Sequence, residues 1–256
     1  MLGKRYYILI IIIMITFVFV ASSARAAEEE KQLMDMANKI AEAKQFSVSM
    51  HMGYDVVQES GQKIEFSEMR KILVSRPNQM RIDAQLSNGD IKGMLFDGKV
   101  ITLFNTSENV YSQTERPGDL DGAIRYAVAI MGVRFPLARM LVTTFPTELQ
   151  KMSGDVDYVE QNTLGAVPTA HIADSTEGVD YQVWIAKDSL PRRVKLTYKN
   201  EPGQPQFWAE LTDWNMKPKV SAASFSFKPP KGAEKIPNVV PASKTKSMSK
   251  AKGGAR

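Results

Sequence analysis

The sequence contains no cysteine and only two histidines in 256 residues. Without cysteine, the chain has no disulfide, no thiolate metal site and no residue that could carry the lipid anchor of a bacterial lipoprotein. His51 and His171 each stand alone in a strand-like stretch, where a histidine is more often an ordinary surface or core residue than a ligand. The sequence therefore predicts no metal site.

Motifs for catalysis are missing as well. The chain has no paired-histidine zinc motif, no G-x-S-x-G turn and no P-loop. The carboxylate pairs Glu65/Glu68 and Asp155/Asp157 fit solvated strand edges and turns better than the acid and base of a glycosidase. We therefore expect no catalytic residue, no cofactor and no enzymatic activity. An enzyme would need a polar cluster in a concave site.

Long apolar runs are confined to one segment near the start of the chain. Lys4 and Arg5 precede an apolar stretch at residues 6–20, and a small-x-small site follows that ends at Ala26. This order predicts a secretory signal peptide over residues 1–26, cleaved near Ala26, so that the mature protein acts outside the cytoplasm. The alternative is an uncleaved membrane anchor. A spanning helix needs about 20 apolar residues, and the stretch at residues 6–20 is shorter than that.

The net charge of +5 comes from the two ends of the chain. Residues 27–230 hold 23 basic and 27 acidic side chains, whereas residues 231–256 hold seven basic and one acidic. A mildly acidic body argues against nucleic acid as a partner. The composition of residues 233–256 predicts a basic, disordered, solubilising tail; contact with an anionic membrane surface or envelope polymer is the alternative.

The spacing of apolar residues predicts one helix followed by many strands. Residues 28–44 have helical spacing, and residues 46–56 then alternate between apolar and polar side chains. Helical spacing returns at 120–131 and 137–142, inside an insert at 117–144. The period of two, separated by turn signals, predicts further strands at residues 64–75, 80–86, 91–96, 100–104, 110–114, 156–161, 169–173, 181–186, 192–198, 206–214 and 224–228.

These elements predict a mainly β protein of the α+β class. The strands form one antiparallel meander of about ten strands, opened by a helix and interrupted by a helical insert. Two groups of strands on either side of one insert exclude the βαβ alternation of a parallel sheet. We assign residues 27–232 to a single domain.

Fourteen methionines are many for a chain of this length. Methionine is flexible and polarisable, so it suits surfaces that adapt to varied apolar ligands, although an ordinary core is the alternative. Several lie on one strand face or on the expected helices: Met34, Met36, Met50, Met52, Met131 and Met140.

The segment at residues 190–215 resembles the signature of DUF2092, a family of periplasmic proteins with no established biochemical function. The matching residues read LPRRV at 190–194, TYKNEPGQPQF at 197–207 and DWN at 213–215. The resemblance covers most of the mature chain.

That family resembles in turn the periplasmic lipoprotein carriers of the LolA and LolB kind and their LppX-like relatives. Three stretches support this wider link in the same order: LVSRPN at 73–78, FDGKVITLF at 96–104 and FSFKPPKG at 225–232. The carriers have a lysine at the position of Ser75, and they lack the long basic tail.

The resemblance implies a LolA-like fold. A single curved antiparallel sheet would form an incomplete barrel, with the N-terminal helix and the inserted helical lid on its concave side. In the carriers, an apolar cavity between sheet and helices receives acyl chains, and an arginine at the position of Arg76 holds the lid by hydrogen bonds. The expected lining of the cavity is Ile40, Phe46, Val48, Met50, Met52, Phe66, Leu120, Ile124, Val128 and Met131.

The resulting hypothesis is a monomeric periplasmic binding or carrier protein for a lipid or the acyl chains of a lipoprotein, with envelope membrane proteins as further partners. The alternative is an envelope-stress sensor or protein-interaction module on the same fold, without lipid transfer.

Overall fold

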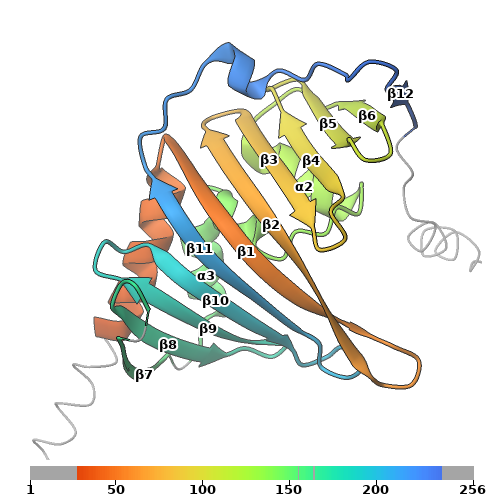
Figure 1. Cartoon of the computed structure of the whole chain (residues 1–256). Helices are drawn as coiled ribbons and strands as arrows, with labels where there is room; N and C mark the ends of the chain where they lie inside the picture. Colours follow the sequence, from red (N-terminus) through yellow and green to blue (C-terminus); the bar gives the residue numbers. More distant parts are fainter. Residues whose placement is uncertain (1–27, 155, 164, 238–256) are drawn as a thin grey trace, which may run out of the picture.

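The computed structural model describes residues 28–237 except residues 155 and 164. The expected signal peptide and residues 238–256 of the expected tail lie outside the described residues. The described chain forms one 12-stranded sheet in the order β12-β6-β5-β4-β3-β2-β1-β11-β10-β9-β8-β7. The sheet is strongly twisted and curves around the N-terminal helix and the helices of the insert, which lie on one side of it (Figure 1).

Alternation of apolar and polar side chains explains the strands. In β1, Phe46, Val48, Met50 and Met52 are buried, whereas the residues between them are half-buried or exposed. The strands are β1 (Gln45–Val57), β2 (Lys63–Ser75), β3 (Gln79–Leu86), β4 (Ile91–Phe96), β5 (Val100–Asn105), β6 (Val110–Glu115), β7 (Asp157–Asn162), β8 (Thr169–Ser175), β9 (Val179–Ala186), β10 (Pro191–Tyr198), β11 (Gln206–Asn215) and β12 (Glu234–Lys235).

Two antiparallel meanders make up the sheet. β1 to β6 form the first and β7 to β11 the second, and they join where β1 pairs with β11. At this junction Met50 lies between Arg70 of β2 and Leu211 of β11. The short strand β12 runs parallel to β6 at the far edge.

The helices cover the inner face of the sheet. Residues 28–42 form the N-terminal helix, which buries Leu33, Met36 and Ile40. Between the meanders lie the helix α2 (Leu120–Ala129), the 3₁₀ helix η1 (Ala138–Leu141) and the helix α3 (Phe145–Met152). The side chain of Asp119 accepts a hydrogen bond of 2.7 Å from the backbone N–H of Gly122, which caps the start of α2.

The predicted fold class is confirmed: a mainly β protein with one curved sheet, an N-terminal helix and inserted helices. The strand predicted at residues 224–228 is wrong, because Ala222–Phe225 forms a 3₁₀ helix (η2) and the following residues form no ladder. In this segment Phe225 is buried and Phe227 stacks on Phe104. The alternation of apolar and polar residues at 224–228 therefore reflects two separate packing contacts. The sequence analysis also missed α3, whose proline occupies a first-turn position that tolerates it.

Candidate ligand-binding cavity

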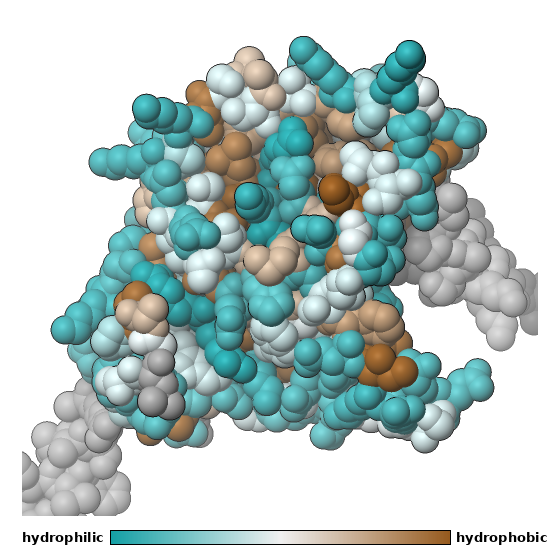
Figure 2. Space-filling model, viewed as in Figure 1, coloured by the Kyte–Doolittle hydropathy of each residue, from teal (hydrophilic) through white to brown (hydrophobic). Residues whose placement is uncertain are grey.

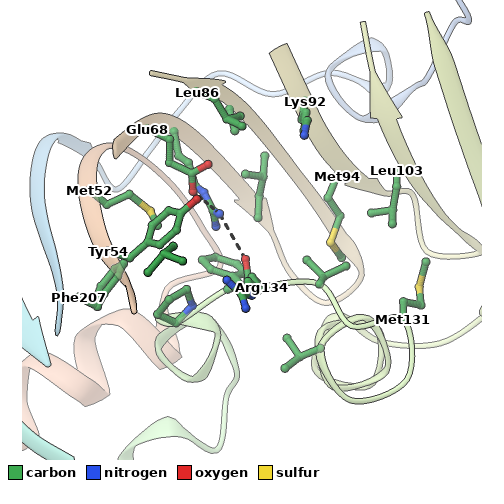
Figure 3. Close-up of a pocket in the computed structure, with 18 of the residues that line it drawn as sticks. Met52, Tyr54, Glu68, Leu86, Lys92, Met94, Leu103, Met131, Arg134 and Phe207 are labelled. Carbon is green, nitrogen blue, oxygen red and sulfur yellow. Dashed lines mark hydrogen bonds and ion pairs between the residues drawn. The ribbon is translucent and has the colours of Figure 1, made fainter. Parts of the chain in front are cut away.

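A cavity of about 1440 Å³ lies between the sheet and the helical insert. Its walls come from β1 to β6, from the loop that follows α2, from the turn between β10 and β11, and from the segment around β12. Figure 3 shows Met94 and Leu103 projecting from the sheet toward the loop that carries Met131 and Arg134. On the side of the molecule seen in Figure 2, by contrast, the surface is mostly polar and its apolar side chains form separate patches.

Three apolar side chains from neighbouring strands form the floor of the cavity. Ile82, Met94 and Leu103 lie in one cross-strand row, since Met94 pairs with both of the others. Val128 and Met131 face them from the end of α2 and the loop after it. Because both sides of this space are aliphatic, an apolar ligand bound there would be transferred from water to an apolar environment, which is favourable.

The next cross-strand row outward carries charge. Arg70 of β2, Ala84 of β3 and Lys92 of β4 are directly paired in that order, and all three line the cavity. Glu68, two positions before Arg70 and on the same face, forms an ion pair with the Arg70 guanidinium. The Glu68 side chain is 9% exposed and that of Arg70 is 12% exposed, so this pair is largely removed from water.

Arg70 joins the sheet to the loop that closes the cavity. Its Nη2 donates a hydrogen bond of 3.3 Å to the backbone carbonyl of Arg134, and its guanidinium lies 5.1 Å from the centre of the Phe135 ring. Among the described residues its buried Nε has no hydrogen-bond partner.

Arg76 fastens three helical segments at the end of β2. Its Nε donates to the carbonyl of Ala43 at 3.2 Å, after the N-terminal helix, and its Nη2 donates to the carbonyl of Leu141 in η1 at 2.8 Å. Its Nη1 lies 3.8 Å from the Asp121 carboxylate of α2. Burial lowers the pKa of Arg76, and Asp121 opposes that shift. Asp121 also accepts from the backbone N–H of Thr143 at 3.0 Å.

The structure divides the expected lining residues between the cavity, the packed core and the surface. Met52, Val128 and Met131 line the cavity. Phe66 is 43% exposed and lies outside the lining, where it stacks on the lining residue Tyr54. The remaining six are buried in the core rather than on the cavity wall: Ile40, Phe46, Val48, Met50, Leu120 and Ile124.

The sequence analysis missed the charged residues of the wall, although a signal was present. In β2, Ile64, Phe66, Ile72 and Val74 occupy alternate positions with a period of two. Glu68 and Arg70 fall on the same face, between these apolar positions. Charges at two successive inward positions of a strand indicate a polar feature inside the fold.

A polar network beyond the cavity has a structural role. Ser153, at the end of α3, contacts the Tyr181 hydroxyl at 2.8 Å, and that hydroxyl donates to the buried carboxylate of Asp174 at 2.8 Å. The backbone N–H of Gly154 donates to the same carboxylate at 3.1 Å. Burial raises the pKa of Tyr181, and Asp174 adds to that shift. These bonds tie α3 to β8 and β9.

The described residues contain no cluster of three or more His, Asp or Glu side chains that could hold a metal ion. His51 packs edge-on against Trp208, and His171 stacks on Trp184. Within the same residues, every helix is too short or too polar to cross a membrane.

Comparison with solved structures gives matches at low sequence identity, with TM-scores below 0.5. LprF from Mycobacterium bovis matches with a TM-score of 0.48 and 10% identity, over 76% of this chain and 96% of that one. The MucA/MucB complex of Pseudomonas aeruginosa matches with a TM-score of 0.41 and 16% identity, over 77% of this chain and 61% of that one. The LolA superfamily protein NE2245 from Nitrosomonas europaea matches with a TM-score of 0.36 and 7% identity, over 77% and 97%.

A search of curated protein sequences gives no match. A family model does match, over residues 30–238, and its description reads "Predicted periplasmic protein (DUF2092)". This range includes the whole sheet and all the helices of the insert, and it confirms the resemblance seen at residues 190–215. The chain belongs to the DUF2092 family of predicted periplasmic proteins.

Proposed function

We propose that this protein binds and carries a lipid or a lipoprotein acyl group in the periplasm, within the cavity between the sheet and the helical insert. The observation that carries the proposal is the cavity itself, about 1440 Å³ with an aliphatic floor. Pockets for small ligands typically measure about 300–1,000 Å³. The space is therefore large enough for an extended or folded acyl chain.

The energetics of burial favour such a ligand. Each methylene moved from water to an apolar site gains about 0.8 kcal/mol. A chain of about 14 methylenes therefore gains about 11 kcal/mol before the costs of ordering and association, which consume several kcal/mol. Of the expected lining residues, Met52, Val128 and Met131 line this cavity and would contact the chain.

A carrier must also release its ligand, and the helical insert supplies a movable wall. Arg76 holds η1 by one hydrogen bond and α2 by one ion pair, so the closed state depends on few polar contacts. Breaking these polar contacts costs a few kcal/mol, and lifting α2 and η1 would also expose Leu120, Ile124 and Leu141, which are buried in the core. An entering chain that pays for opening by its own burial would shift this equilibrium.

Displacement of a fluorescent probe tests the proposal. N-phenyl-1-naphthylamine fluoresces in apolar sites, and purified mature protein should bind it and release it when decanoate is added. Native mass spectrometry of protein purified from the cell envelope should show an adduct of lipid mass. If the protein binds no probe, carries no lipid adduct and captures a stable protein partner in pull-downs, these results would favour an interaction module instead.

A pair of matched variants locates the binding site. Leu103→Glu places a carboxylate on the cavity floor and should abolish probe binding. Gln113→Glu places the same side chain on the neighbouring strand β6, outside the cavity lining, and should leave binding unchanged. Val128→Glu, at a half-exposed position on the opposite wall, repeats the test where folding is less at risk. Equal binding by all three would refute this site.

A further inference from the structure

The charged row above the cavity floor indicates which kind of amphiphile the cavity accepts. We infer that the site selects a chain with an anionic head group, a carboxylate or a phosphate, held by Arg70, Lys92 and Arg134. This inference rests on the proposed function and specifies the chemistry of its ligand.

The three cations surround one region of the wall. Arg70 and Lys92 are separated in the ladder only by Ala84, whose small side chain leaves the space between them open. With strands about 4.8 Å apart, their Cα atoms are about 10 Å apart, a distance that one carboxylate or phosphate group can bridge from both sides. Arg134 stands opposite on the loop, where its carbonyl already contacts Arg70 (Figure 3).

The donors of these side chains are only partly used. In the described part of the chain, Arg70 forms its ion pair with Glu68 while its Nε remains without a partner. None of the carboxylates described there lies within ion-pair distance of Lys92 or Arg134. Three cations and one carboxylate leave this region with a local excess of positive charge, which favours an anionic acceptor.

Other carboxylates lie farther out on the cavity rim. Glu59, Glu108 and Glu201 are exposed residues in the turns after β1, β5 and β10. Charges at such positions, like those of the exposed Lys92 and Arg134, are screened by salt within about 8–10 Å, whereas the Arg70 side chain is only 12% exposed and is screened less. Asp55 also lines the cavity, but its carboxylate accepts a hydrogen bond from the backbone of Gln206. The preference for an anion therefore depends on the local charge of the row and not on the net charge of the whole lining.

The order of the rows sets the orientation of the ligand. The aliphatic row of Ile82, Met94 and Leu103 lies on the side toward the core, and the row with Arg70 and Lys92 lies one step toward the rim. A chain that places its head group at the cations therefore extends its tail over the floor and under Met131. A neutral alcohol of equal length would fill the same floor without using the cations.

The test compares ligands that share one chain and differ in the head group. Displacement of N-phenyl-1-naphthylamine from wild-type mature protein should need about tenfold less decanoate or decyl phosphate than decanol, and decyltrimethylammonium should be weaker still. Inorganic phosphate alone should not displace the probe, which distinguishes a lipid head group from free phosphate. Displacement by inorganic phosphate, or equal potency of decanoate and decanol, would overturn the inference.

Matched variants assign the preference to the row. Lys92→Met and Lys71→Met each remove one positive charge from an exposed strand lysine, but Lys71 lies on the opposite face of the sheet, outside the cavity lining. The first should reduce the potency advantage of decanoate over decanol about threefold to tenfold, and the second should leave that advantage unchanged. Arg134→Gln, at an exposed loop residue, should act like Lys92→Met.

These measurements distinguish a failure of the proposed function from a failure of the inference about the head group. A protein that binds no probe at all refutes the proposed function and the inference with it. A protein that binds the probe and all decyl compounds equally keeps the proposed function and refutes the inference alone. An anion preference that survives Lys92→Met, Arg134→Gln and the double variant Glu68→Gln/Arg70→Gln also refutes it, because the preference would then arise elsewhere.

Discussion

Arg76 offers the sharpest test of how the helical insert is held. In the structure one guanidinium contacts the chain after the N-terminal helix, η1 and α2, through the carbonyls of Ala43 and Leu141 and the carboxylate of Asp121. Arg76→Met keeps most of the apolar stem and removes all three contacts at once. We expect the free energy of unfolding to fall and the insert to open more often.

The magnitude follows from the contacts and from the cost of burying them. A hydrogen bond from a charged group contributes about 1.5–3 kcal/mol, and two are lost here. The lowered pKa of Arg76 shows that burial penalises its charge, which offsets part of this gain. Loss of the Arg76 cation also leaves the Asp121 carboxylate, which is 15% exposed, without its ion-pair partner. We therefore expect a net loss of about 2–4 kcal/mol.

Urea unfolding followed by circular dichroism measures the loss, and hydrogen exchange of residues 138–145 reports opening of the insert. Arg81→Met is the matched control, because Arg81 bonds Asp83 at 2.8 Å on β3, where both side chains are only half-buried. It should cost less than about 1 kcal/mol. Equal costs for the two variants, or unchanged exchange in Arg76→Met, would refute the reasoning.

Three further predictions concern the core, the sheet and the pH dependence. Ile40→Ala should destabilise the protein by about 2–5 kcal/mol in urea unfolding, because Ile40 is fully buried, whereas Val128→Ala on the cavity wall should cost much less. Gly93→Ala should cost about 1–3 kcal/mol in the same assay, because its Cβ would collide with the Phe104 ring and with the backbone carbonyl oxygen of Ile82. The pKa of Tyr181 is raised above its ordinary value of 10.0, so its contribution to stability is complete below pH 10 and is lost as the pH rises through the folded-state pKa. The urea midpoint should therefore fall less steeply between pH 9 and 11 in Tyr181→Phe than in the wild type.

Each of these has a clear contrary outcome. Equal costs for Ile40→Ala and Val128→Ala would contradict the division between core and cavity. A fully stable Gly93→Ala would show that the Phe104 ring moves aside at no cost, and Gly165→Ala, in a loop with its nearest atom at 3.7 Å, serves as its control. Identical pH profiles for wild type and Tyr181→Phe would remove Tyr181 from the alkaline transition.

Local patterns predicted most of the fold because they depend on near neighbours. The period of two in β1 follows from one buried face, and the turns at Gly61 and Gly89 adopt the positive φ that glycine permits. The pairing of β1 with β11 joins segments that are far apart in the chain, and no local pattern encodes it. Phe225 and Phe227 gave a false strand prediction, because two independent packing contacts produce the same period of two in the sequence.

The candidate site was harder to predict because burial alone does not separate a wall from a core. Phe46 and Met52 share one face of β1, yet Phe46 packs under the helices and Met52 reaches the cavity. The difference depends on where the loop after α2 passes, which is a tertiary property. Arg134 illustrates the same point, since its role depends on a contact with Arg70 that only the folded chain creates.

The junction of β1 and β11 also bears on how the protein is made. β1 can pair with β2 as soon as the first meander is synthesised, but its other edge stays open until residues 206–215 arrive. An open edge flanked by apolar side chains is prone to pair with other chains, and contacts this distant in sequence slow folding. Until this junction closes, the open edge of β1 leaves a newly made chain prone to aggregation.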